Sequence, residues 1–460
     1  MARFREVLRL NFALLFRNDL ARSSATILII RAVNVVSASL LSIILVRALG
    51  LHGYGFYALY MSIFALVSLP ITSGMPTFIV KEVAPMFAQQ NGNQIRSIIT
   101  FALRAASIYM CLLAACLFVA WYLRLAWEYR IFGVLMWFHV AIQIINACRS
   151  AILRAVGRII KGQLIDRLIQ PTLAVSFTTV WWALSGNRFT VLEALLALLT
   201  SNALCLSLGA HWVRQTLLGL KFDSIPATTG VGYLKTLLNL SGVGLLNSLF
   251  TNGVTLIVGW VGSIESAAIY RIAASVAIIL NYLQEVMIQV VAPNVAQLWY
   301  EGERRRIVTI LMVGAVINSV TIGMGTAALA VFGHDVLRIA FGPQYQGAYF
   351  ALVILCSSNL AYALGGYRDL LLNMSGHANE SFRVSAVLVP ISLIFATVGV
   401  LEYAEVGAAA TVLFFQITAS VWLALATKKF TGIDPSIFGL LGNKHLDDSE
   451  RRSPMGRNFK

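Results

Sequence analysis

Long apolar runs dominate this chain and leave few folds open to it. A helix needs about 20 apolar residues to cross a bilayer, and the sequence contains such runs from end to end. They cover residues 24–48, 56–80, 98–122, 131–152, 167–185, 190–211, 236–260, 269–291, 307–333, 346–370, 382–402 and 404–428. Only 12% of the 460 residues are charged, whereas a soluble domain has about 25%. We therefore predict an all-α integral membrane protein with about 12 transmembrane helices.

Three short patterns of the first half return in the second half, in the same order. The pairs are Ala84-Pro85-x-x-Ala88-Gln89 with Ala292-Pro293-x-x-Ala296-Gln297, Arg149-x3-Leu153-x3-Gly157…Pro171 with Arg368-x3-Leu372-x3-Gly376…Pro390, and Gly50-x6-Tyr57 with Gly262-x7-Tyr270. Their offsets are 208, 219 and 212 to 213 residues. We interpret the chain as one unit of roughly 210 residues used twice. In a membrane protein, a twofold repeat is typical of transporters whose substrate path lies between the halves.

The basic residues predict the orientation in the membrane. With the N-terminus inside, most of the 35 lysines and arginines fall in inside segments. Those at outside ends or loops are Arg47, Arg124, Arg130, Arg188 and Arg338. This positive-inside bias places both termini in the cytoplasm and accounts for the net charge of +15, so we do not interpret that charge as nucleic-acid binding. Six spans in each half make the two repeats parallel, around a central cavity.

The same patterns predict five segments along the chain. Residues 1–22 alternate arginines with apolar side chains, which is typical of an amphipathic segment at the cytoplasmic surface. Two six-helix bundles follow at 23–211 and 236–428, joined by a cytoplasmic linker at 212–235. Residues 429–460 form a polar cytoplasmic tail. No cleavage site precedes the first apolar run, so we expect no signal peptide.

Ionisable and polar groups inside the spans are the candidate substrate-binding residues, because an ionised side chain at mid-helix costs about 2.5–3.5 kcal/mol on insertion scales. Arg31 lies about two turns into the first span, and Asn34 shares its helical face. Arg104 and Arg271 lie close to span ends. Each of the three arginines has two interpretations, as a cation that lines a cavity or as a side chain that reaches the headgroups.

Polar residues also concentrate on the seventh and eighth spans. Asn247 and Asn252 belong to a segment dense in small and polar residues, which suits a cavity wall or close helix packing. On the eighth span, Arg271, Tyr282 and Glu285 fall on one stripe. Glu285 is the carboxylate placed deepest in a span. It is our candidate for ion or proton coupling, and the alternative is a structural carboxylate paired to a donor.

Enzyme motifs are not found in the sequence. It contains no nucleotide-binding loop, no nucleophile elbow and no His-Glu-x-x-His, and its six histidines lack metal-ligand spacing. We therefore predict a transporter with no catalytic residues, no metal and no cofactor. Without an ATP site, the driving force would be a gradient of H⁺, Na⁺ or the substrate.

Several degenerate motifs resemble those of the polysaccharide-biosynthesis flippases, whose superfamily also holds multidrug and toxin extrusion transporters and lipid II flippases. The motifs are Arg47-Ala-Leu-Gly50 leading to Tyr54-Gly55-Phe56-Tyr57, Leu153-Arg154-Ala155-Val156-Gly157-Arg158, and Phe341-Gly342-Pro343-x-Tyr345-x-x-Ala348. The resemblance covers all twelve spans. Pro343 departs from a usually more permissive stretch and affects only the local loop geometry.

The resemblance implies a multi-pass protein of the bacterial inner membrane. It would move an undecaprenyl-diphosphate-linked oligosaccharide from the cytoplasmic to the periplasmic leaflet by alternating access, for O-antigen, capsule or exopolysaccharide synthesis. Its partners would be that lipid, the bilayer, and a polysaccharide polymerase with its chain-length regulator. We expect a monomer, because two halves already supply a complete pathway.

Two other functions remain open at this point. An ion-coupled multidrug exporter of cations would need an acidic cavity, but the intramembrane residues include more arginines than carboxylates. An integral-membrane glycosyltransferase or polymerase would need a long outside loop with catalytic residues, and no outside loop reaches about 20 residues.

Overall fold

The computed structural model describes residues 19–122, 127–217, 231–301, 303–434, 436 and 439. Regular structure within these ranges is helical, with no strand. The predicted N-terminal segment 1–22, linker 212–235 and tail 429–460 lie largely outside the described residues. Contacts between residues divide the chain into two compact units, Met1–Ser248 and Leu249–Lys460.

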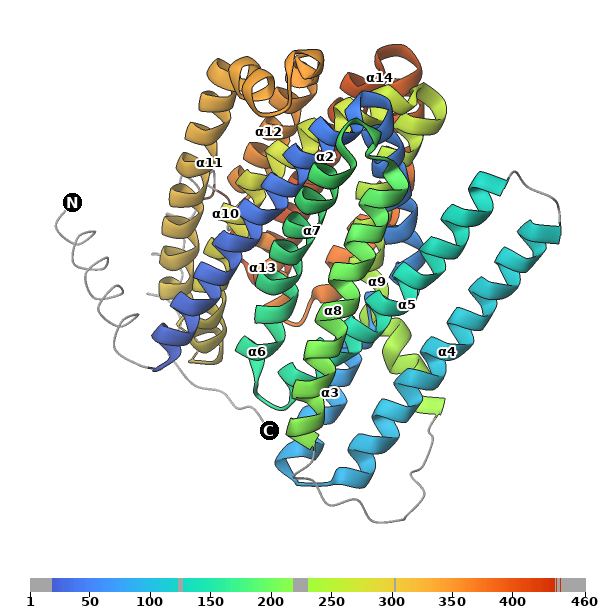
Figure 1. Cartoon of the computed structure of the whole chain (residues 1–460). Helices are drawn as coiled ribbons and strands as arrows, with labels where there is room; N and C mark the ends of the chain where they lie inside the picture. The colour runs from blue at the N-terminus through green and yellow to red at the C-terminus, as the bar shows by residue number, and fades with distance from the viewer. Residues whose placement is uncertain are drawn as a thin grey trace. The chain divides into compact units, whose positions relative to one another are not determined.

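Figure 1 labels the helices of the first unit, and α5 connects most of them through its contacts. Its elements are α2 (Asp19–Thr72), α3 (Met75–Ala88), α4 (Gly92–Tyr122), α5 (Trp127–Ala155), α6 (Ile159–Leu164), the π-helical turn η1 (Ile165–Ile169), α7 (Gln170–Ser185), η2 (Gly186–Arg188) and α8 (Val191–Leu217). Helix α5 contacts α2, α3, α4 and α8. Fully buried apolar side chains such as Phe78, Ile95 and Ile144 join α3, α4 and α5 into one core, and this core holds α5 in place.

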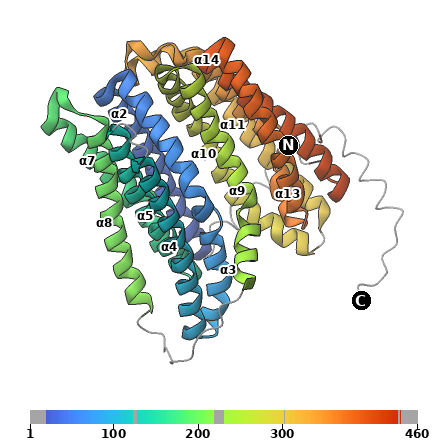
Figure 2. The same ribbon diagram turned by 90° about the vertical axis from the view of Figure 1, so that its right-hand side faces the viewer.

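The second unit contains the remaining helices. Its elements are the part of α9 (Val231–Ile257) from Leu249 on, the π-helical turn η3 (Val258–Gly262), α10 (Ile264–Glu301), α11 (Arg304–Ala340), η4 (Pro343–Tyr345), α12 (Ala348–Leu364), α13 (Arg368–Met374) and α14 (Ala378–Thr431). Helix α10 contacts α11 and α14 (Figure 2), and α12 contacts all three. The boundary between the units falls inside α9, after Ser248. The helices α8 and α9 also extend into both ends of the predicted linker.

The twelve predicted spans all coincide with helices. Eight described stretches are long and apolar enough to cross a membrane. Two of them, Ile29–Phe87 and Asn379–Thr431, have 59 and 53 residues and are each long enough for two passes. The shorter helices α7 and α12, of 16 and 17 residues, provide the remaining spans. The prediction of an all-α membrane fold with two six-helix repeats is therefore confirmed.

Each of the two longest helices is a hairpin of two spans. In α2 the chain reverses at Gly50, whose φ of 69° is a left-handed conformation that glycine adopts without steric cost (Figure 1). The reversal brings Ser42 and Tyr54 within 3.2 Å of each other, hydroxyl to hydroxyl. In α14 the helix breaks at Tyr403 and Ala404, which lie in the short separation predicted between the last two spans.

The second span is not the single helix predicted over residues 56–80. Helix α2 ends at Thr72 and α3 begins at Met75. Pro76 lies in the first turn of α3, where a missing N–H costs no helical hydrogen bond. Gly74 and two nearby prolines, Pro70 and Pro76, thus weaken the helix enough to break it.

The sequence repeat is also a repeat of local structure. Gly157 and Gly376 have φ values of 78° and 82°. The residue that follows each glycine donates its backbone N–H to the carbonyl five residues earlier. These hydrogen bonds run from Arg158 to Leu153 and from His377 to Leu372, and both are 2.9 Å long. This is the Schellman arrangement that ends a helix with a left-handed residue, so the repeated Leu-x3-Gly pattern marks the same helix end in both units.

The repeated arginines are buried structural residues in both units. The side chain of Arg368 is 1% exposed. Its Nη1 donates to the carbonyl of Tyr362 at 3.2 Å, and its guanidinium lies 4.6 Å from the centre of the Tyr362 ring. Asp369 accepts hydrogen bonds from Tyr362 and Ser381 beside it. In the first unit, Arg149 is 4% exposed, and its contacts help to define the candidate site.

Substitution of Gly407 tests the α14 hairpin. The backbones of Gly399 and Gly407 touch across the turn, and a Cβ on Gly407 would overlap the carbonyl of Gly399. We expect Gly407→Ala to destabilise the protein by about 1–3 kcal/mol, because the backbone cannot move aside. Thermal unfolding of the purified protein in detergent measures this. The control is Gly347→Ala, where a new Cβ has no atom within 4 Å. An equal melting temperature for both variants would contradict the hairpin.

Candidate functional site

A cavity of about 590 Å³ lies inside the first unit. Helices α2, α5 and α8 and the segment from α6 to α7 form its walls. The lining residues are Arg31, Leu41, Tyr57, Met61, Phe64, Pro76, His139, Gln143, Asn146, Ala147, Ser150, Arg154, Gln163, Asp166, Arg167, Gln170, Leu198, Asn202 and Cys205. This volume suits a small ligand or part of a larger one, and more than half of the lining side chains are polar.

One face of α5 forms a continuous polar stripe along the cavity. His139, Gln143, Asn146, Ser150 and Arg154 all line it, at steps of three and four residues that place them on the same side of a helix. The 15 residues from the first to the last correspond to about 22 Å at 1.5 Å per residue. The core formed with α3 and α4 covers the opposite face of α5, so the stripe faces the cavity.

The π-helical turn η1 supplies charged residues to the cavity wall. Its residues include Asp166 and Arg167, which both line the cavity. A π-turn holds one residue more than an α-turn and shifts the side chains that follow, and such turns occur frequently at functional sites. Gly162, just before η1, lies against Ser150, so this segment packs along the last turns of α5.

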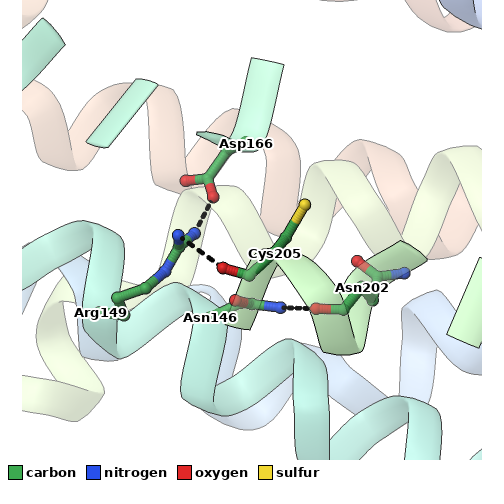
Figure 3. A network of polar contacts seen from close by, with 5 residues as sticks. All are labelled: Asn146, Arg149, Asp166, Asn202 and Cys205. Carbon is green, nitrogen blue, oxygen red and sulfur yellow. Dashed lines mark hydrogen bonds and ion pairs between the residues drawn. The ribbon is translucent and has the colours of Figure 1, made fainter. Parts of the chain in front are cut away.

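A buried network fixes the position of Asp166 (Figure 3). The guanidinium of Arg149 forms an ion pair with the Asp166 carboxylate, and its Nη1 donates to the carbonyl of Cys205 at 3.3 Å. One turn earlier on α5, Asn146 Nδ2 donates to the carbonyl of Asn202 at 3.2 Å. The network joins α5, η1 and α8, and it pairs the carboxylate of the cavity wall with a cation that lies behind the wall.

The lining is therefore cationic. Arg31, Arg154 and Arg167 supply three positive charges. Asp166 is the carboxylate among the described lining residues, and Arg149 already pairs with it. Guanidinium groups carry a permanent charge and several donors in a planar fork, which suits phosphate and carboxylate oxygens. This wall can bind an anion in a membrane-spanning region.

Several buried polar atoms of the lining residues have no hydrogen-bond partner within the part of the chain that the structure describes. They are Nε2 of His139, Oδ1 of Asn146, Nε of Arg154 and Oε1 of Gln163. The carbonyls of Leu135 and Leu195 lie near the His139 ring, without hydrogen-bonding geometry to Nε2. Buried polar groups are normally satisfied, so four such atoms in residues that line one cavity make its wall unusually polar.

The residues predicted from the first half occupy three different environments. Arg31 lines the cavity. Asn34, on the same helix, is buried and is not part of the lining. Arg104 is exposed on α4 and lies outside the lining, a position that fits the interpretation of a side chain reaching the headgroups. The structure therefore groups Arg31 with Arg154 and Arg167 rather than with Arg104.

The residues predicted from the seventh and eighth spans do not line this cavity. Asn247 is exposed and Asn252 half-buried on α9. On α10, Arg271 and Tyr282 are half-buried and Glu285 is exposed. Their assignment to substrate binding, and that of Glu285 to ion coupling, stays a prediction.

Arg154 and Arg167 are the site residues that sequence analysis missed. Both were assigned to the cytoplasmic segment after the fourth span, because basic residues gather there for orientation alone. The three- and four-residue spacing of polar residues from His139 to Arg154 was visible in the sequence. No comparable spacing in the sequence identifies Arg167, because the π-helical turn η1 places it in the cavity wall.

Solved transporter structures share this fold. A multidrug resistance MATE family transporter of the MOP superfamily, in an inward-facing conformation, matches with a TM-score of 0.69 and 14% identity over 91% of this chain and 96% of its own. An outward-facing conformation of a multidrug resistance MATE family transporter matches with a TM-score of 0.62 and 15% identity over 91% of this chain and 98% of its own. A MOP superfamily transporter from Pyrococcus furiosus, described as having a binding pocket of reverse polarity, matches with a TM-score of 0.63 and 15% identity over 90% and 96%. The protein is thus a multi-pass membrane protein with the MOP transporter fold.

Comparison of the sequence with family models identifies the family within this class of membrane proteins. Residues 44–349 match the polysaccharide biosynthesis protein family. The chain belongs to this family, as the motifs at the first outside turn and after the fourth span indicated. No curated protein matches it in sequence.

Proposed function

We propose that the protein is a flippase for an undecaprenyl-diphosphate-linked oligosaccharide in the synthesis of a surface polysaccharide. The observation that carries this proposal is the cationic cavity inside a membrane-spanning bundle, with Arg31, Arg154 and Arg167 in its wall. Family membership supplies the link to polysaccharide synthesis, and the fold is that of transporters.

The chemistry of such a lipid fits this wall. A diphosphate cannot cross about 30 Å of hydrocarbon without replacement of its hydration shell. Arginine side chains replace part of that shell with charge-assisted hydrogen bonds, which can be bidentate. Amides such as Gln143, Gln163 and Gln170 offer donors and acceptors to glycan hydroxyls. The lipid tail stays in the bilayer.

A cation exporter is the weaker alternative on the same evidence. Such a protein needs carboxylates that attract the cargo, and the described lining offers Asp166, which Arg149 neutralises. Three arginines in the same wall repel a cationic drug. The lining therefore favours an anionic cargo.

The proposal includes a setting in the cell. The protein lies in the bacterial inner membrane with both termini in the cytoplasm, as the positive-inside bias predicts. A gradient of H⁺ or Na⁺ drives the cycle, with Glu285 as the coupling carboxylate. The protein works as a monomer alongside a polymerase and its chain-length regulator.

The lipid-linked glycan pool of a strain lacking the gene tests this function. We expect undecaprenyl-linked oligosaccharide to accumulate on the cytoplasmic side of the membrane, and wild-type protein to clear it. Arg31→Ala should insert normally and fail to clear the pool, because it removes one of three cations from the cavity. Glu285→Gln should fail as well if this residue couples the ion.

Membrane levels of each variant, measured by immunoblotting, separate loss of transport from loss of protein. An unchanged pool with normal surface glycan in the deletion strain would refute the oligosaccharide assignment. Full clearance by Arg31→Ala would remove this residue from the site and leave the assignment itself standing.

A further inference from the structure

The cavity of the first unit has two chemically different ends. Arg154 lies at one end of the α5 stripe and is half-buried, and the lining residue Arg167 is exposed. His139 lies at the other end of the α5 stripe and is 5% exposed. Eleven residues of helix separate Gln143 from Arg154, or about 16 Å at 1.5 Å per residue. The two ends therefore contact different parts of an elongated ligand.

The buried end is aromatic and carries a fixed imidazole. The ring of His139 lies between those of Tyr60 and Phe64, with ring centres 6.0 and 5.8 Å away in edge-to-face geometry. Its Nδ1 lies 3.1 Å from the Tyr60 hydroxyl, and its Nε2 has no hydrogen-bond partner. Phe64 and Tyr57 also line the cavity, and Tyr57 stacks on Tyr54 at 5.9 Å. Packing thus fixes one polar atom among aromatic surfaces.

Amides follow the imidazole along the same stripe. Asn146 is 7% exposed, and its Nδ2 is engaged by the Asn202 carbonyl. Its Oδ1 remains buried at the cavity without a partner. Gln143 lies between His139 and Asn146 on the cavity face. On the α5 stripe, this end offers acceptors and donors on uncharged groups.

We infer that this buried end is a sugar subsite, distinct from the cationic end. A sugar ring presents apolar C–H faces and a rim of hydroxyls. The aromatic side chains Tyr57 and Phe64 match the faces, and His139, Gln143 and Asn146 match the hydroxyls. An apolar lipid tail is a poor occupant, because it would cover the polar side chains of His139, Gln143 and Asn146 that line this end. The inference rests on the proposed function and adds where the glycan binds.

The subsite assigns an orientation to the cargo. The diphosphate contacts Arg154 and Arg167 at the cationic end, and the first sugars extend along α5 toward His139. The affinity for the whole cargo then depends on contacts to the diphosphate and to the sugars. The part of the affinity that the sugars contribute depends on the buried end alone. Two probes that differ only in a sugar separate these contributions.

The test is the affinity of the purified full-length protein, in detergent, for farnesyl diphosphate and for the same lipid carrying one sugar. The sugars are a hexose, an N-acetylhexosamine and a uronic acid. We expect the wild type to bind at least one glycosylated probe roughly tenfold more tightly than farnesyl diphosphate, as two or three hydrogen bonds would provide. Gln143→Leu and His139→Phe should reduce this ratio toward one and leave the affinity for farnesyl diphosphate unchanged.

The comparison variant is Arg167→Gln. It should weaken the binding of both probes equally and so preserve the ratio of the two affinities. His139→Phe keeps an aromatic ring between Tyr60 and Phe64, and unchanged binding of farnesyl diphosphate shows that each variant is folded. A wild type without preference for any sugar, or a ratio that survives both buried-end variants, would overturn the subsite and leave the flippase proposal intact. A wild type that binds neither lipid would refute the proposed function itself.

Discussion

Replacing Arg149 by alanine is expected to cause a large loss of stability in the first unit. The side chain is 4% exposed and joins Asp166 to the Cys205 carbonyl (Figure 3). Removing one partner of a buried ion pair typically costs about 3–5 kcal/mol. Asp166 is 34% exposed, so solvent screens part of this cost, and we expect about 2–4 kcal/mol. The yield of monodisperse protein and its melting temperature in detergent measure the effect.

Two variants test the cause of this loss. Gly209→Ala should also be destabilising, because a new Cβ there would overlap the Arg149 side chain. Arg158→Ala removes an exposed arginine whose Nη1 donates to Thr216 Oγ1 at 2.8 Å, and it should cost less than about 1 kcal/mol. Wild-type melting of Arg149→Ala would show that the network is dispensable for folding.

Loss of the cationic wall should have the largest effect on cargo binding. Arg154→Gln and Arg167→Gln keep long polar side chains and remove the charge. A hydrogen bond to a charged group contributes about 1.5–3 kcal/mol, so each variant should bind farnesyl diphosphate about 10- to 100-fold more weakly. The double variant should fail to clear lipid-linked glycan in cells. Affinity of the purified proteins and the cellular glycan pool are the two measurements.

Arg104→Gln provides the matched control for these variants. It removes the same charge from an exposed position on α4 outside the cavity, and we expect affinity and clearance within twofold of wild type. A loss of affinity in Arg104→Gln equal to that in Arg154→Gln would mean that general charge, rather than the cavity wall, attracts the lipid.

The arginines show how far local sequence can identify a site. Arg31 was recognised because a cation inside an apolar run is costly wherever the helix packs. The same argument selected Arg104, which is exposed on α4. Arg154 follows a span and lies in a basic segment. In such a segment, the sequence does not distinguish an arginine that stabilises the fold from one that sets the orientation or binds a ligand. Only packing distinguishes it from Arg149, one and a half turns earlier, whose guanidinium lies behind the wall.

The apolar runs, the charge bias and the repeat were enough to predict a twelve-span membrane protein, because each of these properties is local or can be read by comparing the chain with itself. The family was predicted separately, from the resemblance of short motifs. Even the shared helix ends at Gly157 and Gly376 follow from a repeated pattern. The composition of the cavity depends instead on tertiary contacts. Tertiary contacts bring Arg31, the α5 stripe and η1 to one space, and the pairing of Arg149 with Asp166 decides which charges remain in its wall.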